Sequence, residues 1–79
     1  MTTNNNSHPC NGYDAALGDL VMKIEHYTRQ HNVTFGSVMQ NIHNNEFTER
    51  FLHIARKYEH KADDVIDRMY EFHESWEGV

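Results

Sequence analysis

The feature that most constrains this chain is an apolar residue at every turn of one helix over its last thirty or so residues. The steps between these residues are four, three, four, four, three, four, three and four. The residues are Phe47, Phe51, Ile54, Tyr58, Ala62, Val65, Met69, Phe72 and Trp76. Only an α-helix places such a series on one side. A single helix over residues 46–77 would be roughly 45 Å long at ~1.5 Å per residue. Its apolar side must then be covered by the rest of the chain or by another copy.

A break in this long helix is the alternative interpretation. Two successive steps of four meet at Tyr58, and such a stutter locally unwinds a helix pair. Residues 59–64 are the least apolar stretch, and Asp63 could cap a new helix there. Because the apolar phase persists through Val65 and Met69, we expect the helix to be continuous.

Two shorter helices are expected before it, over residues 13–31 and 35–43. The first has apolar residues at heptad spacing, namely Tyr13, Leu17, Leu20, Ile24 and Tyr27. Asn32 is a plausible terminator of this helix, and Thr34 is a good N-cap for the next. The sequence therefore predicts an all-α fold, a helical hairpin or small bundle in which two shorter helices pack along one long C-terminal helix. Residues 1–12 are predicted to form a flexible N-terminal arm, which leaves 13–79 as a single helical domain.

Length and composition favour self-association. A chain of 79 residues with 38% hydrophobic residues has little apolar surface for a core. We therefore expect a homodimer or a larger oligomer. The single cysteine, Cys10, forms no internal disulfide, and the sequence has no long apolar run and no basic leader. These features predict a cytoplasmic protein without a membrane span.

The net charge of −5 is concentrated at the C-terminal end. Residues 59–79 hold seven acidic side chains against Lys61 and Arg68. An acidic chain without a basic cluster does not favour non-specific nucleic-acid binding. The candidate docking face for a basic protein partner consists of Asp63, Asp67, Glu71 and Glu74. The alternative is that these residues only keep the outer helix face soluble.

Histidine is unusually frequent, with seven residues. Histidine binds transition metals, and two ligands four residues apart on a helix can share one ion. His60 and Asp64 have this spacing and are the candidate metal ligands. The alternative is a surface pair of no special function, because no complete metal motif is present.

Catalytic patterns are missing from the sequence. Cys10 lies in the predicted arm, and Ser7, Ser37 and Ser75 lack the context of a nucleophile elbow. The scattered glycines form no phosphate-binding loop. We therefore predict a non-enzymatic protein without a cofactor.

The aromatic side of the long helix is the candidate interface. It consists of Phe47, Phe51, Tyr58, Met69, Phe72 and Trp76, and exposed aromatic surface commonly marks binding sites. We predict a self-associating helical module that binds another protein, in the manner of a regulator or inhibitor. A metal-binding or small-molecule-binding protein, with the ligand held between subunits by His and Tyr side chains, is the alternative. A small enzyme ranks third.

Overall fold

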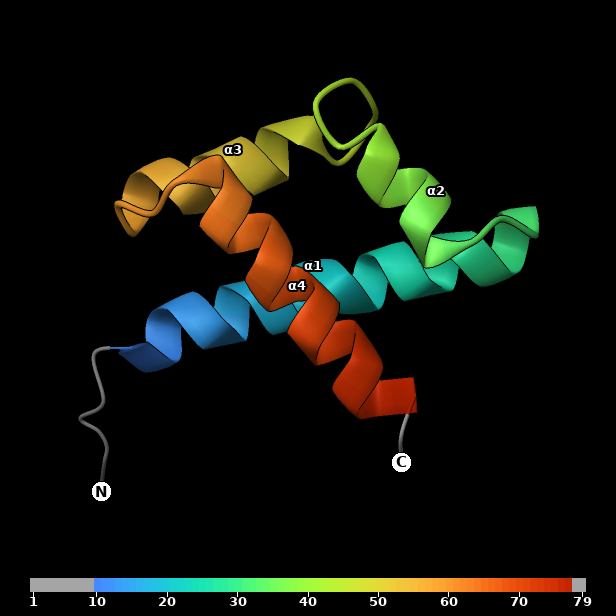
Figure 1. Ribbon diagram of the computed structural model, residues 1–79, viewed down its shortest axis with the longest axis horizontal. Helices are drawn as coiled ribbons and strands as arrows, with labels where there is room; N and C mark the ends of the chain where they lie inside the picture. The colour runs from blue at the N-terminus through green and yellow to red at the C-terminus, as the bar shows by residue number, and fades with distance from the viewer. Residues whose placement is uncertain (1–9, 78–79) are drawn as a thin grey trace.

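The computed structural model describes residues 10–77, with side chains for residues 12–75. This part of the chain forms four helices and no strand, which confirms the all-α class (Figure 1). The helices are α1 (Cys10–His31), α2 (Phe35–Gln40), α3 (Thr48–Lys57) and α4 (Ala62–Glu77). Helix α1 packs against each of the other three, and α3 also packs against α4. Figure 1 shows α4 crossing α1.

The N-terminal boundary differs from the prediction. Helix α1 begins at Cys10, so residues 10–12 belong to the helix and not to an arm that extends to residue 12. The part of the predicted arm before Cys10 lies outside the described residues. Gly12 lies under an aromatic ring, since a Cβ atom at this position would come within 3.2 Å of the Tyr58 hydroxyl. The first turn of α1 is therefore part of the packed structure.

The prediction of a continuous helix over residues 46–77 is wrong. The chain leaves α3 after Lys57 and starts α4 at Ala62. The break begins at Tyr58, where the two steps of four meet. It turns Val65 and Met69 into the core, where both side chains are fully buried. Helices α3 and α4 thus pack on a shared core and do not form one long apolar helix face.

The end of α3 has the hydrogen bonds of a Schellman motif. The His60 N–H donates to the Ala55 carbonyl at 2.9 Å, and the Glu59 N–H donates to the Arg56 carbonyl at 3.3 Å. Glu59, the first residue after the C-cap, adopts a left-handed conformation with φ 58°. This position usually carries glycine, because a Cβ atom is strained there.

Helix α1 ends in the same way. The Val33 N–H donates to the Thr28 carbonyl at 3.1 Å, and Asn32 has φ 54°. Asparagine tolerates the left-handed region better than other non-glycine residues. The prediction that Asn32 terminates the first helix is confirmed.

Replacing Glu59 by glycine is expected to stabilise the protein. Glu59 is exposed, so the substitution acts on the backbone and removes a strain of about 1–2 kcal/mol. The greater freedom of glycine in the unfolded chain opposes this gain by about 0.4–1 kcal/mol. We expect the free energy of unfolding, measured by urea denaturation, to rise by up to about 1 kcal/mol.

The matched control is Asn32→Gly, which should give a smaller gain because asparagine is already tolerated. Glu59→Val should destabilise the protein, since a branched side chain is poorly tolerated at positive φ. If Glu59→Gly instead lowered the free energy of unfolding, the left-handed turn would be contradicted.

Helix α2 begins as predicted and ends early. The Thr34 hydroxyl accepts a hydrogen bond from the Ser37 N–H at 3.0 Å, which confirms Thr34 as the N-cap. The helix ends at Gln40, three residues before the predicted end at 43. This short helix still contributes Phe35 and Val38 to the core.

The connection from α2 to α3 is held by two polar side chains. The Asn45 amide donates to the Val38 carbonyl at 3.1 Å, and its oxygen accepts from the Phe47 N–H at 2.8 Å. The Thr48 hydroxyl donates to the Ile42 carbonyl at 2.8 Å. These bonds satisfy the Val38 and Ile42 carbonyls and the Phe47 N–H in the connection. Helix α3 then begins at Thr48 and not at residue 46.

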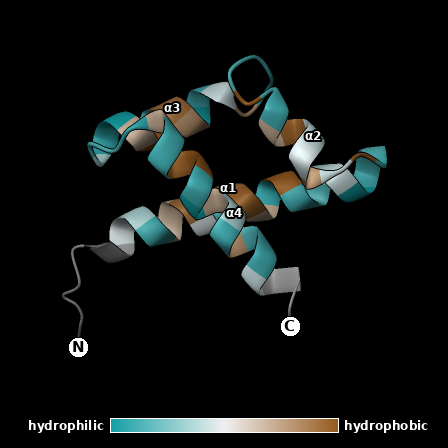
Figure 2. Cartoon of the chain, in the orientation of Figure 1, coloured by the Kyte–Doolittle hydropathy of each residue, from teal (hydrophilic) through white to brown (hydrophobic). Residues whose placement is uncertain are grey.

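The core lies between α1 and the other three helices. Figure 2 colours the chain by hydropathy and shows hydrophobic segments, in brown, in each of these helices. The fully or nearly fully buried members of the core are Leu17, Leu20, Val21, Ile24, Phe35, Val38, Met39, Ile42, Phe47, Phe51, Ile54, Ala55, Val65 and Met69. Of the heptad positions predicted for the first helix, Leu17, Leu20 and Ile24 are buried in this core, and Val21 beside them adds a fourth residue of α1. Among the described side chains, the only large hydrophobic ones that are exposed are Met22 at 59% and Val33 at 39%.

Candidate binding site

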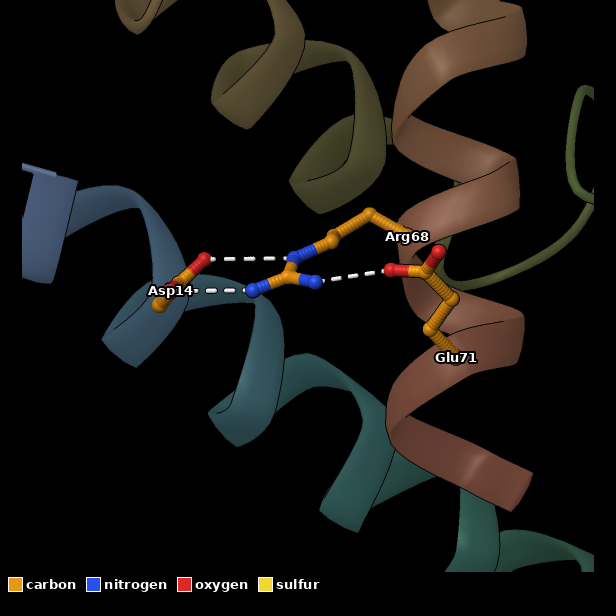
Figure 3. Close-up of polar contacts among 3 residues, drawn as sticks. All are labelled: Asp14, Arg68 and Glu71. Carbon is orange, nitrogen blue, oxygen red and sulfur yellow. Dashed lines mark hydrogen bonds and ion pairs between the residues drawn. The ribbon is translucent and has the colours of Figure 1, made fainter. Parts of the chain in front are cut away.

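An arginine clamp joins the start of α1 to the middle of α4 (Figure 3). Arg68 donates from Nε and Nη2 to the Asp14 carboxylate at 3.4 and 3.2 Å, and from Nη1 to Glu71 Oε1 at 2.7 Å. The hydrogen bonds to Glu71 and then to Asp14 raise the pKa of Arg68 above its ordinary value. Burial raises the pKa of the neighbouring Tyr13 hydroxyl, and the positive charge of Arg68 acts in the opposite direction. The clamp fixes how α4 crosses α1.

A second polar contact joins three helices. The His73 ring on α4 pairs through Nδ1 with the Glu25 carboxylate on α1, and both side chains are only 15% exposed. The same ring stacks on Phe35 of α2, with ring centroids 4.0 Å apart and an interplanar angle of 4°. This arrangement explains the position of α2 and α4 on α1, and it gives one of the seven histidines a structural role.

The predicted metal pair does not have the geometry on which the prediction rested. His60 lies in the turn before α4 and Asp64 lies inside α4, so the two residues do not share a helix face. The His60 ring instead stacks on Tyr13, with centroids 4.0 Å apart. Within residues 10–77, no group of three or more His, Cys, Asp or Glu side chains is arranged to hold a metal ion.

We expect His60 to contribute to stability through this ring contact. His60→Ala should lower the free energy of unfolding by about 0.5–1.5 kcal/mol, the range for an aromatic pair. A metal chelator should leave the free energy of unfolding, measured by urea denaturation, unchanged in the wild-type protein and in His60→Ala. If the chelator destabilised the wild-type protein and had no effect on His60→Ala, a metal site at His60 would be supported instead.

The four residues of the predicted acidic face are exposed on α4, and their docking of a basic partner stays a prediction. Asp63, Asp67 and Glu74 are exposed on α4. Glu71 is also exposed, but its carboxylate is engaged by Arg68. Asp63 lies in the first turn of α4, where a negative charge stabilises the helix dipole. Part of this face therefore has a role within the fold.

Most residues of the predicted aromatic interface lie in or against the core of the single chain. Phe51 and Met69 are fully buried, and Phe47 is 6% exposed. Tyr58 and Phe72 are partly buried against the same core. Trp76 lies in the last turn of α4, and its side chain is outside the described side chains. Phe47, Phe51 and Met69 were predicted to form an interface, but the break after α3 folds them into the core of the single chain.

A groove runs between α1 and α3. Its first part has a volume of about 310 Å³ and an apolar floor of Ala16, Leu20 and Ile54. Its second part has a volume of about 550 Å³ and reaches Tyr27 and Phe47. Asp19 and Arg50 line both parts, so the two hollows adjoin. We call this feature the α1–α3 groove.

The edges of the groove are polar and exposed. They include Lys23, His26 and Arg29 on α1, and Glu49 and His53 on α3. Met22 lies on the same edge of α1 and is the most exposed large hydrophobic residue in the described part of the chain. An apolar floor with charged edges is the form of a site for an amphipathic helix.

Sequence reasoning missed this groove, although one signal was present. Met22 is a large apolar residue outside the heptad series of the first helix, so it does not belong to the core side of α1. The floor itself depends on how α1 and α3 lie against each other, which no local pattern contains.

Comparison of this chain with protein-family models, with curated protein sequences and with solved structures finds no match. Among residues 10–77, no helix combines the length and the apolar character needed to cross a bilayer. Among the described residues, the α1–α3 groove and the exposed side chains around it are the features that bear on function.

Proposed function

We propose that this chain is a non-enzymatic protein-binding module that holds a helix of its partner in the α1–α3 groove. The observation that carries the proposal is the exposed Met22 beside a groove with an apolar floor. The groove follows α1 from Ala16 to Gln30, which is roughly 20 Å at ~1.5 Å per residue. This length suits about four turns of a helix.

The chemistry of the groove favours a protein helix over a small molecule. Small-molecule sites enclose their ligand and direct a few polar groups at it. Here the charged groups Asp19, Arg50 and His53 are exposed along the edges, where they would flank the apolar side of a helix. A module of this kind acts by occupying a surface of its partner, as a regulator or inhibitor does.

Site-specific photo-crosslinking tests this proposal. A benzophenone amino acid is placed at His53 in the groove, or at Asp67 on the outer face of α4 as the matched control. Both positions are exposed and both lie on helices. After irradiation in cell lysate, mass spectrometry of the adducts should find a helical protein segment attached at position 53 and none at position 67.

A second probe position at Glu49 covers the case in which the benzophenone at position 53 itself blocks the groove. Adducts at 67 without adducts at 49 or 53 would contradict the proposal and favour docking of a basic partner on the acidic face. In that case the adducts should also disappear at high salt, because exposed charges are screened. The absence of adducts at all three positions would overturn the proposal as well.

A further inference from the structure

We propose that the helix held in the α1–α3 groove is α1 of a second copy of this chain, lying antiparallel to the first. This inference rests on the proposed function and names the partner of the same site. It places a two-fold axis near Met22, so that each copy contributes an identical surface.

The contact surface is one exposed side of α1. Its residues are spaced by four, three, four and three, and all are exposed; they are Ala15, Asp19, Met22, His26 and Arg29. This spacing places them along one line of the helix. The four from Asp19 to Arg29 also line the groove. The exposed side and the groove therefore form one continuous surface.

The charges on this surface complement each other only in the antiparallel sense. Asp19 lies in the N-terminal half of the surface, and His26 and Arg29 lie in the C-terminal half. With Met22 opposite Met22, an antiparallel pair brings Asp19 of each copy opposite His26 of the other. A parallel pair would instead place like residues side by side, which is unfavourable for the charged ones. Antiparallel helices also align their dipoles favourably.

The contacts of Asp19 within one chain leave its carboxylate available for this match, and Arg50 on α3 lies close to it. Arg50 lines both parts of the groove beside Asp19, and within residues 12–75 it makes no ion pair. The only described ion pair of Asp19 is with Lys23 at 3.3 Å, between two exposed side chains, and such pairs are weak. Asp19 therefore has no strong ion pair within one chain, and its carboxylate is available to a second copy.

The sizes of the side chains also complement each other. The antiparallel register places Ala15 opposite Arg29, a small side chain against a long one. Next to Ala15 on this side of α1, a Cβ atom at Gly18 would meet nothing within 4 Å, so the described part of the chain leaves this space open. The long side chains in the C-terminal half of one copy can lie against the small residues of the other.

Disulfide trapping in purified protein tests the inference. In a Cys10→Ser background, Met22→Cys should form a covalent dimer under a mild oxidant, because the two-fold axis brings the two cysteines together. Ala15→Cys and Arg29→Cys should each stay monomeric when oxidised alone and should cross-link when mixed. Asp67→Cys, an exposed position on the outer face of α4, is the control and should not cross-link.

Cross-linking of all three α1 variants with themselves would indicate a parallel pair and overturn the inference. So would cross-linking no faster than the control. As an independent measurement, Asp19→Lys should weaken self-association by about tenfold, since it replaces the carboxylate opposite His26 by a cation on a surface that already carries Lys23 and Arg29. Adding His26→Asp should restore it by reversing the pair. These positions are exposed, and circular dichroism would confirm that each variant folds.

The two proposals can fail separately. Benzophenone adducts from another protein at position 53, together with an absence of self cross-linking, would retain the proposed function and overturn this inference. The absence of both adducts and cross-links would overturn both.

Discussion

Phe51→Ala is expected to remove a large part of the protein's stability. The Phe51 ring is fully buried in the core and makes an edge contact with His43 at a centroid distance of 5.5 Å. Truncating a buried phenylalanine costs about 3–5 kcal/mol. A chain of this length is stable by only about 4–12 kcal/mol at roughly 0.05–0.15 kcal/mol per residue. Thermal unfolding followed by circular dichroism should show a large fall in Tm or a loss of the transition.

The control for this variant is His53→Ala on the same helix. His53 is exposed, so its truncation should change the free energy of unfolding by less than about 0.5 kcal/mol. If Phe51→Ala kept the wild-type Tm, the packing of α3 against α1 and α4 would be contradicted.

His73→Ala is expected to lower the free energy of unfolding by about 2 kcal/mol, the middle of the range for a hydrogen bond to a charged group. The substitution removes the stack on Phe35 and leaves the nearly buried Glu25 carboxylate without this partner. Urea denaturation of His73→Ala, Glu25→Ala and the double variant forms a double-mutant cycle. The double variant should lose less stability than the sum of the two single losses.

The exposed pair of Asp19 and Lys23 provides the comparison. These side chains are 64% and 43% exposed, and such pairs contribute up to about 1 kcal/mol and commonly less. The corresponding cycle should give a coupling energy below about 0.5 kcal/mol. Equal coupling in the two cycles would contradict the structural role of the His73 contact.

The fold class and several helix ends could be predicted because their signals are local. Heptad spacing placed the core side of the first helix, Asn32 suits the left-handed turn that ends it, and Thr34 caps the next. These effects act within one or two helical turns. They do not depend on how the helices are later arranged.

The break between α3 and α4 could not be predicted in the same way. Its left-handed residue is Glu59, and a glutamate gives no signal for a helix end. The apolar residues also keep a near-helical phase across residues 58–61, so the periodicity conceals the turn. Tertiary packing determines the break, because folding back allows both halves of the stripe to cover one core.

The candidate sites depended on the same misplaced helix. Continuity was the reason to place His60 and Asp64 on one helix face and to assign Phe51 and Met69 to an interface. Once the chain folds back, the first two residues no longer share a helix face and the other two become core. The residues of the predicted acidic face are exposed because outward positions of α4 stay outward under either arrangement. The α1–α3 groove is a product of tertiary structure, and only Met22 indicated it.

Sedimentation equilibrium over a range of protein concentrations, with Met22→Glu compared against Val33→Glu, decides whether two copies of the chain associate through α1. The two residues are the exposed large hydrophobic ones among the described side chains, and only Met22 lies on the α1 contact surface. The wild-type protein and Val33→Glu should shift from monomer to dimer as concentration rises, whereas Met22→Glu should remain a monomer because a charged group would be buried at the two-fold axis. A concentration-independent monomer for the wild-type protein, or equal association of all three, would contradict the claim that this surface joins two copies of the chain.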